Sequence, residues 1–181
     1  MSRAGAAVAL LGALLGCTDT TDATVAPTLA PCVLPYAGES MCLQVTDDDG
    51  APRRVARDGM LYLRHAWGET VAIAYAEPRG DEALNCSPVA NECHRVVDQE
   101  VTARMAVGTR FSIAFADDGA GRTWLAASGQ GVRMGTDVLE AEPAVAAQAL
   151  ELDAMPVAYQ LDLVLTGRAT APLRLVAATA R

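Results

Sequence analysis

The chain has 181 residues, of which 51% are hydrophobic and 20% charged, and its formal net charge is −8 at pH 7. This length suits one ordinary domain or two small ones, with enough apolar residues for a real core. The acidic balance offers no electrostatic footprint for nucleic acid and does not favour anionic lipid head groups. We therefore expect no nucleic-acid partner.

Residues 1–16 are organised like an export signal. Arg3 precedes an unbroken run of small apolar residues from Ala4 to Leu15. This run is shorter than the roughly 20 apolar residues that a membrane-spanning helix needs. A positive start, a short apolar stretch and a small residue before a cleavage point are typical of a secretory signal peptide. We therefore predict that residues 1–16 are a signal peptide and that the protein is exported.

The end of this run, Leu14-Leu15-Gly16-Cys17, resembles the lipobox of bacterial lipoprotein precursors. The resemblance implies cleavage before Cys17, a diacylglycerol on its thiol, and a membrane as the partner of that lipid. In this family an Asp directly after the cysteine tends to retain a protein in the inner membrane, so Thr18 implies the outer membrane. From the residues alone, two alternatives stay open: an ordinary signal peptide that contains a cysteine, and an apolar N-terminal strand.

Residues 17–31 have no hydrophobic period and are rich in Thr, Ala, Pro and Asp. Such a composition is typical of a flexible linker. We predict that this segment tethers a folded domain, residues 32–181, to the lipid on Cys17.

Four cysteines remain beyond Cys17, namely Cys32, Cys42, Cys86 and Cys93. An even number of cysteines in an exported chain predicts two disulfides, with three possible pairings. The simplest pairing joins neighbours in the sequence, Cys32 with Cys42 and Cys86 with Cys93.

A metal site is the alternative use of such side chains. Zinc would need ligands such as Cys93, His94 and His65, but the chain has no Cys-x-x-Cys pair and its cysteine spacings match no zinc pattern. Calcium would need Asp47–Asp49 and Asp58, which do not follow the EF-hand pattern, although another kind of calcium site stays open. We expect no metal and no cofactor.

From Cys42 onward, apolar and polar residues alternate with the period of two that is typical of half-buried strands. Asp-Gly dipeptides at 49–50, 58–59 and 118–119, and glycines at 129, 131 and 167, predict the turns between them. Short strands separated by such turns predict an all-β protein, an antiparallel β-sandwich that ends in a hairpin. The strands expected are 42–46, 60–66, 71–76, 123–128, 137–142, 157–166 and 172–179.

Residues 143–154 carry two conflicting patterns. Val145, Ala149 and Leu152 lie at helical spacing behind a proline, whereas residues 150–153 alternate like a strand. In an all-β setting we favour a loop followed by a short strand.

The segment 63–77 resembles the segment 103–117, which lies forty positions later. Each copy is expected to form a strand, a turn centred on Gly and a second strand with an aromatic residue near its end. Two copies predict either one sandwich built from similar halves or two small β-domains with a boundary near 98–100. The strand–Gly–strand pattern resembles that of bacterial immunoglobulin-like domains and implies an immunoglobulin-like sandwich.

Between the copies lies a loop rich in Pro, Asn, Asp and Glu, residues 77–93, which we expect Cys86 and Cys93 to tether. It contains Arg79-Gly80-Asp81, the tripeptide with which adhesins bind integrins. We interpret this tripeptide as a chance occurrence in a chain with 15 glycines.

The sequence contains no recognisable catalytic motif. A Ser-His-Asp triad would need His65 or His94, the two histidines of the chain, and no Gly-x-Ser-x-Gly elbow is present. Nothing selects a catalytic pair from the 22 acidic residues. No phosphate-binding loop or dinucleotide motif occurs. These patterns favour a protein without catalytic activity.

Three functions are compatible with the sequence. The first is a lipid-anchored β-sandwich that binds a protein or glycan partner in the cell envelope. The second is an accessory or structural subunit of an envelope assembly, recognisable by an unpaired edge strand that a partner completes. The third is an envelope hydrolase whose residues meet only in the fold. We favour the first two, which the sequence does not separate.

Overall fold

The computed structural model describes residues 20–35, 38–88, 90, 92–117, 123–129 and 131–181. Its elements in chain order are β1 (Thr21–Leu34), β2 (Gly38–Asp47), β3 (Pro52–Val55), η1 (Arg57–Gly59), β4 (Met60–Leu61), β5 (Glu69–Ala76), η2 (Gly80–Asn85), β6 (His94–Arg104), β7 (Arg110–Phe115), β8 (Leu125–Ser128), β9 (Gly131–Met134), β10 (Asp137–Ala141), α1 (Pro143–Asp153), β11 (Tyr159–Leu165) and β12 (Leu173–Ala180).

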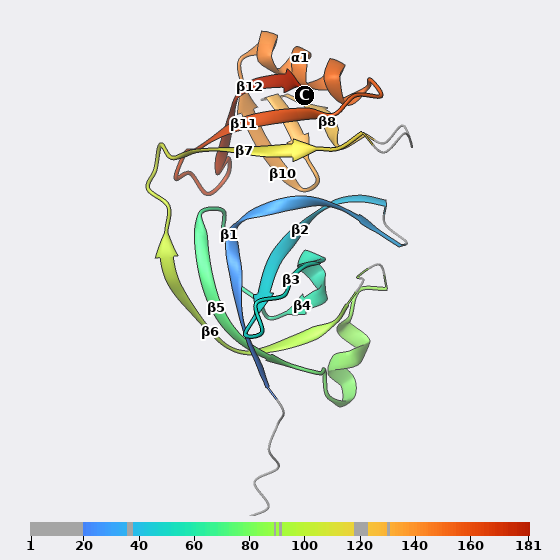
Figure 1. Ribbon diagram of the computed structural model, residues 1–181, viewed down its shortest axis with the longest axis vertical. Helices are drawn as coiled ribbons and strands as arrows, with labels where there is room; N and C mark the ends of the chain where they lie inside the picture. Colours follow the sequence, from blue (N-terminus) through green and yellow to red (C-terminus); the bar gives the residue numbers. More distant parts are fainter. Residues whose placement is uncertain (1–19, 36–37, 89, 91, 118–122, 130) are drawn as a thin grey trace, which may run out of the picture.

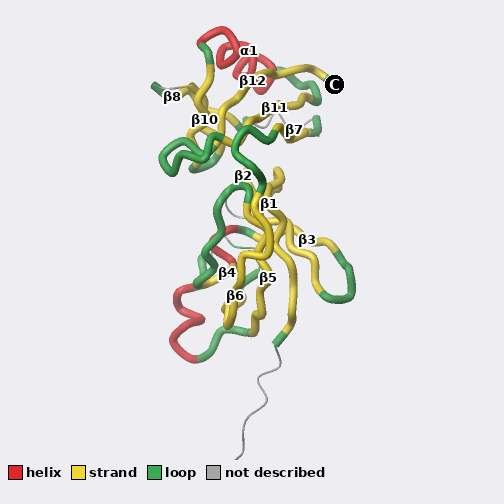
Figure 2. Tube along the Cα trace, turned by 90° about the vertical axis from the view of Figure 1, so that its left-hand side faces the viewer, coloured by secondary structure: helices red, strands yellow, loops and turns green. Residues whose placement is uncertain are grey.

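The strands form two six-stranded sheets (Figure 1). The first sheet has the order β3-β2-β1-β5-β6-β4, and the second has the order β7-β11-β12-β10-β9-β8. Neighbouring strands are antiparallel except for the pairs β4–β6 and β10–β12. In both views of the chain, α1 lies at the end of the molecule away from η2 (Figures 1 and 2).

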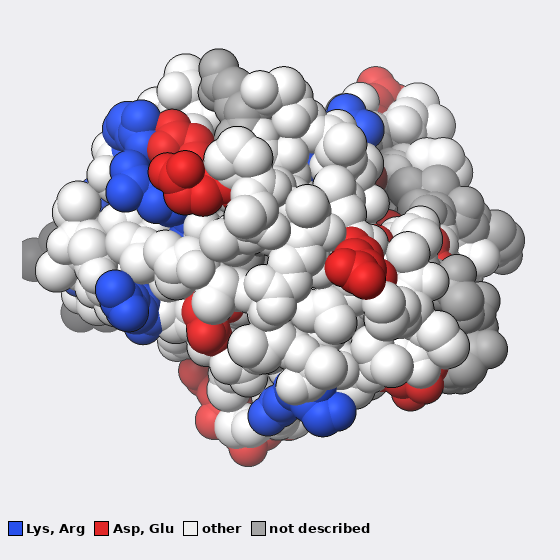
Figure 3. Space-filling model, turned by 90° about the horizontal axis from the view of Figure 1, so that it is seen from above, with Lys and Arg blue, Asp and Glu red and all other residues white. Residues whose placement is uncertain are grey.

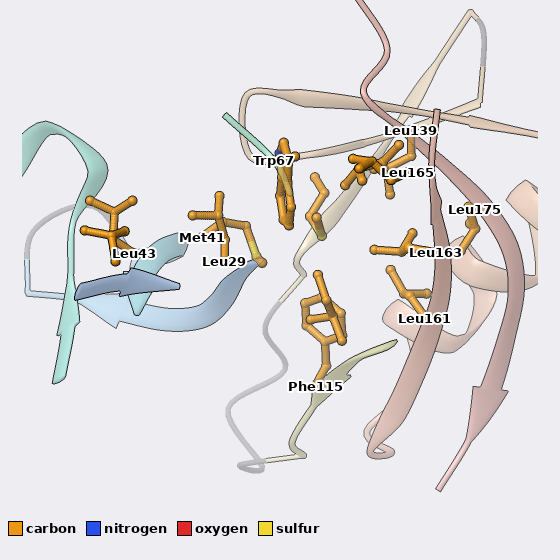
Figure 4. Packing of buried hydrophobic residues seen from close by; sticks show 14 of the residues in the cluster. Leu29, Met41, Leu43, Trp67, Phe115, Leu139, Leu161, Leu163, Leu165 and Leu175 are labelled. Atoms are coloured by element: carbon orange, nitrogen blue, oxygen red, sulfur yellow. The ribbon is translucent and has the colours of Figure 1, made fainter. Parts of the chain in front are cut away.

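A single hydrophobic cluster runs through both sheets. Figure 4 shows Leu29 and Met41 of the first sheet on one side of Trp67, and Leu165 of the second sheet on the other. Trp67 is buried, and its indole stacks on the ring of Phe111 with 6.1 Å between the ring centroids. The two sheets therefore pack against each other, which confirms the predicted all-β sandwich.

Each sheet takes its strands from one continuous part of the chain. The first sheet uses residues 21–104 and the second uses residues 110–180, so the chain changes sheet once, at 105–109. The boundary expected near 98–100 is wrong, because those residues lie inside β6 and pair with β5. The strand order also differs from that of immunoglobulin domains, in which the chain passes repeatedly between the sheets.

The tether expected at 17–31 is wrong for most of its length, because β1 begins at Thr21 and is a central strand of the first sheet. Its apolar residues Val25 and Leu29 are buried in the core. The pairing of β1 with β2 shifts register between these two residues, and Pro27 lies in this irregular stretch. A proline fits there because a bulge needs no ladder hydrogen bond from its nitrogen. The folded domain therefore starts at residue 21 and not at 32.

The expectation of a loop and a short strand at 143–154 is also wrong, because this segment forms α1. Pro143 occupies the start of the helix, where its missing N–H is not needed. Ala146 and Ala149 are buried on the side that packs against the second sheet. The side chains of Leu150 and Leu152 both contact the core from the last turns of the helix, which explains the apparent alternation.

Most of the other strands are confirmed within one or two residues, except that β2 begins four residues before the strand expected at 42–46. The expected strands 42–46 and 71–76 lie inside β2 and β5, and 137–142, 157–166 and 172–179 correspond to β10, β11 and β12. The strand expected at 123–128 begins at residue 125. Hairpins turn at Gly50 and Gly167, both with positive φ. The dipeptide at 118–119 lies outside the described residues.

The strand expected at 60–66 is shorter than predicted. Only Met60 and Leu61 pair with β6, and the next residue, Tyr62, adopts a positive φ of 69° that turns the chain away from the ladder. Asp58-Gly59 lies in η1 and not in a hairpin.

The two similar segments have the same backbone conformation at their glycines but different surroundings. Gly68 and Gly108 have φ values of 86° and 89°, and β5 and β7 follow them. However, β5 lies in the first sheet and β7 in the second, so the two similar segments contribute strands to different sheets.

Both disulfides have the predicted pairing. Cys32–Cys42 joins β1 to β2, and Cys86–Cys93 closes the loop between η2 and β6. Closing loops of this length stabilises a fold by about 2.5 kcal/mol each in the chain-entropy account. Two disulfides indicate an oxidising environment outside the cytoplasm. None of the helices formed by the described residues has both the length and the apolar character to cross a bilayer.

Candidate functional site

The outer edge of β6 is the main unpaired backbone of the first sheet. This strand is 11 residues long and pairs with β5 along its length. On its other side, only His94 and Arg95 pair with a strand, the two-residue β4. Among the described residues, 96–104 therefore have no strand on that side. Such a row of peptide groups is a template for pairing with another chain.

Two irregularities interrupt this edge. The register of β6 against β5 shifts at Val97 and again at Thr102, and residues 98–101 between them pair regularly. The N–H of Gln99 donates a hydrogen bond to the carboxylate of Asp98 at 2.8 Å. Asp98 therefore binds one peptide N–H of this strand. Bulges also hide the alternation that marks a strand, which is why the sequence pattern does not predict β6.

A groove of about 500 Å³ lies beside this edge, on the face of the sheet that carries Val71 and Val101. The segment 63–66 forms its other wall, held by a hydrogen bond from the N–H of Arg64 to the side-chain oxygen of Gln99 at 2.9 Å. Apolar and charged groups share the lining, which consists of Leu63, Arg64, His65, Ala66, Glu69, Val71, Gln99, Val101 and Arg104.

His65 lies in the wall of this groove but is bonded as a structural group. Its Nε2 atom lies 2.9 Å from the carbonyl oxygen of Ala26 and 3.1 Å from that of Glu69. Carbonyl oxygens only accept, so Nε2 carries the proton and donates to both. Burial lowers the pKa of His65, which keeps the ring neutral. In the described structure, the His65 ring contacts neither a serine hydroxyl nor an aspartate carboxylate. The Ser-His-Asp triad considered for His65 therefore does not form.

His94, the other histidine, belongs to a cluster of polar side chains at the η2 end of the first sheet. Its Nε2 atom lies 2.9 Å from Oε2 of Glu92, and its ring packs edge-on against Tyr75. Arg53 contacts the same Glu92 and also binds Asp47, with Nε 3.0 Å from Oδ2. No serine takes part, so His94 does not form a triad either.

The charges in this cluster stabilise one another. Burial by itself would lower the pKa of Arg53, but the hydrogen bond to Asp47 and the charge of Glu92 outweigh it and raise that pKa. Burial and a hydrogen bond to Asp47 at 2.9 Å raise the pKa of Tyr75. The guanidinium of Arg53 also lies over the Tyr75 ring, 5.0 Å from its centroid. The cluster is a structural network of ion pairs and hydrogen bonds in which Nδ1 of His94 is buried without a hydrogen-bond partner among the described residues, and it places no nucleophile beside a base.

The side chains considered for a metal site are engaged elsewhere. Cys93 is in a disulfide, and His65 and His94 have the separate partners given above. Asp47 binds Arg53 and Tyr75. The described residues bring together no group of three or more His, Cys, Asp or Glu side chains that could hold a metal ion.

The one buried carboxylate of the described core, that of Asp153 at the end of α1, is 4% exposed. It accepts hydrogen bonds from the N–H groups of Trp124 (2.9 Å) and Leu125 (3.0 Å) and from the hydroxyl of Tyr159 (2.5 Å). Burial and the bond to Asp153 raise the pKa of Tyr159 far above its usual value. A cavity of about 100 Å³ adjoins this group. Its satisfied bonds make Asp153 a link between α1, β8 and β11.

The Arg-Gly-Asp tripeptide and the aromatic surface are the remaining candidate groups. Arg79 precedes η2 and donates its N–H to the carboxylate of Glu82 at 3.0 Å, so the Arg-Gly-Asp tripeptide starts a short helix. Tyr62 is the strongly exposed aromatic side chain of the described residues, and no exposed aromatic patch surrounds it. Cys17 lies outside the described residues, as do residues 1–16.

No protein-family model, no curated protein sequence and no solved structure matches this chain.

Proposed function

We propose that this protein is a lipid-anchored protein of the cell envelope, held by Cys17 in the outer membrane, whose non-catalytic β-sandwich binds an extended segment of another envelope protein. The lipobox-like signal and the two disulfides support the anchor and the compartment. The observation that carries the binding function is the free edge of β6, where residues 96–104 pair with β5 on one side and, within the described part of the chain, with no strand on the other.

The groove beside the edge supports strand addition over other modes of binding. In strand addition the main-chain hydrogen bonds supply affinity, and alternate side chains of the added segment enter pockets that supply specificity. Here Val71 and Val101 form an apolar floor, and the exposed guanidinium of Arg64 lies at the wall. A segment with an apolar residue at its centre and an acidic residue beside it fits this lining. A glycan is less favoured because the described surface has no aromatic platform.

Edge variants test the proposal directly. Gln99→Pro removes an N–H from β6 and stiffens the strand, whereas the matched control Gln99→Ala keeps that N–H and removes the same side chain. Ala103→Lys leaves the backbone intact and places a charge that opposes strand pairing on the edge. A photo-crosslinking residue placed at position 102 of this protein, expressed in the cell envelope, reports on contact with the partner.

We expect one crosslinked envelope protein whose modified peptide is an extended segment, with crosslinking lost in Gln99→Pro and Ala103→Lys and weakened less in Gln99→Ala, which loses only the side chain that binds Arg64. The corresponding synthetic peptide should bind the wild type and not the two edge variants. Unchanged crosslinking in both edge variants, with unfolding curves that show them folded, would overturn strand addition at β6.

The anchor has its own test. The intact mass of the membrane-fraction protein should show acyl chains on Cys17, and Cys17→Ala should release the protein from the membrane. An unmodified Cys17 in the wild type would overturn the anchored function.

A further inference from the structure

The distance between Cys17 and the folded domain is short. Three residues, 18–20, separate Cys17 from Thr21, where β1 begins. An extended chain covers at most ~3.6 Å per residue, so the four steps from Cys17 to Thr21 span at most about 14 Å. A lipid on Cys17 would therefore hold the start of β1 close to the membrane surface. This closeness to the membrane rests on the lipid anchor of the proposed function.

The structure shows which surface lies at that end. Thr21 pairs with Tyr75 at the end of β5, and the N–H of Asp48 donates to the carbonyl of Asp22 at 3.2 Å. The turn after β2 and the segment after β5 therefore surround the start of β1. Figures 1 and 2 show η2 at this end and α1 at the opposite end.

An apolar side chain is presented on η2. Leu84 is 83% exposed, more than any other large apolar side chain of the described residues. Its helix is held in place on both sides, because Cys86–Cys93 closes the loop behind it and Glu82 pairs with Arg95 of β6 at 3.2 Å. Leu84 is therefore an apolar side chain in a fixed position at the anchored end, where it could enter a membrane interface.

We propose that η2 docks on the bilayer surface with Leu84 among the lipid head groups, so that the domain stands upright with α1 facing away. The exposed carboxylates of Asp48, Asp49, Glu77 and Asp81 lie at the same end, in the turn after β2, after β5 and in η2. Anionic lipids would repel these groups, so the fitting surface is a zwitterionic one. At the α1 end, by contrast, Figure 3 shows acidic and basic side chains interspersed.

This orientation also selects the occupant of the β6 edge. Because β6 is antiparallel to β5, it starts at the membrane end and runs away from it, with Val96 opposite Tyr75 and Arg104 opposite Glu69. Two copies that joined their β6 edges antiparallel would carry their anchors at opposite ends. Short stems do not allow this within one membrane, so the orientation favours a segment of another protein over an antiparallel pair of copies.

Two cysteine reporters test the docking. Ala83→Cys lies next to Leu84 and keeps it, and the matched control Ala147→Cys lies on the exposed side of α1. Each lipidated variant is placed in phosphatidylcholine vesicles and reacted with a charged maleimide, without reducing the disulfides. We expect position 83 to react about tenfold more slowly on vesicles than in the soluble Cys17→Ala background, a factor that partial burial of one leucine can supply. Position 147 should react equally in both.

Three further results are expected if η2 docks. Leu84→Ser restores the reactivity of position 83, as does a long Gly-Ser insertion between Thr18 and Asp19. Vesicles rich in phosphatidylglycerol reduce the protection. Equal reactivity of position 83 on vesicles and in solution, with acyl chains on Cys17 confirmed by mass, would overturn the docking and leave the anchor intact. A mass without acyl chains would instead overturn the anchor itself.

Discussion

The guanidinium of Arg53, on β3, pairs with the carboxylate of Glu92, which lies two residues before β6. β3 is one end strand of the first sheet and β6 lies next to the other end strand, β4, so the pair links the two sides of the curled sheet at the η2 end. The same Glu92 carboxylate also contacts His94, and the Arg53 side chain binds Asp47. The first sheet is thus held by charged groups at one end and by the shared hydrophobic core at the other.

We expect Arg53→Met to lower the free energy of unfolding by about 2 kcal/mol, because Asp47 and Glu92 would be left partly buried without a counter-charge. Arg168→Met is the matched control, because its pair with Glu140 lies on the exposed surface and should contribute below about 1 kcal/mol. Urea unfolding followed by circular dichroism measures both. Equal losses in the two variants would show that the Arg53 cluster does not hold the sheet.

The hydroxyl of Tyr159 should make stability depend on pH in the alkaline range. Its pKa is raised in the folded state by burial and by Asp153, so the unfolded chain loses this proton first as the pH rises above about 10. Stability supplied by the protonated hydroxyl is then present below that pH and lost above it. The free energy of unfolding of the wild type should therefore fall between about pH 9 and pH 11 more steeply than that of Tyr159→Phe.

At neutral pH, Tyr159→Phe itself should lower the free energy of unfolding by about 2 kcal/mol, because a buried hydrogen bond to a carboxylate is removed. Tyr75 has a raised pKa as well, but it is present in both proteins and cancels from the comparison. Parallel pH profiles for the two proteins would contradict the assigned role of Tyr159.

The two glycines of the similar segments should differ in their tolerance of a side chain. Both have positive φ, which disfavours alanine by about 1 kcal/mol. A Cβ on Gly108 meets nothing within 4 Å, whereas a Cβ on Gly68 would lie 2.7 Å from Cδ2 of Leu165 in the core. We therefore expect Gly108→Ala to lower the free energy of unfolding by about 1 kcal/mol and Gly68→Ala by about 2–3 kcal/mol. Thermal and urea unfolding would show the order, and a reversed order would contradict the packing at this junction.

The disulfides should contribute unequally. Replacing Cys86 and Cys93 with alanine should lower the free energy of unfolding by about 2.5 kcal/mol, because the unfolded chain gains conformational entropy when the cross-link is lost. Replacing Cys32 and Cys42 should cost about 1 kcal/mol more, because Cys42 is fully buried and its loss leaves a small cavity. Urea unfolding of the two double variants measures the difference. A smaller loss of stability in the Cys32–Cys42 variant would contradict the expected cavity at Cys42.

The sequence by itself determined the features that depend on neighbouring residues. Alternation predicted β5, β11 and β12, because one side of each strand faces the core and successive side chains point to opposite faces. The turns at Gly50 and Gly167 follow from the backbone freedom of glycine. Both disulfides could be predicted because each joins cysteines only ten and seven positions apart.

Only the tertiary structure decided the features that depend on distant partners. Bulges in β1 and β6 hide their alternation, and these strands exist because β5 lies between them and pairs with both. The helix α1 prevails over the strand pattern because Ala146 and Ala149 pack closely on the second sheet and Asp153 binds the backbone of β8. The free edge of β6 likewise results from how distant strands pair, and no local pattern records which strand is left without a neighbour.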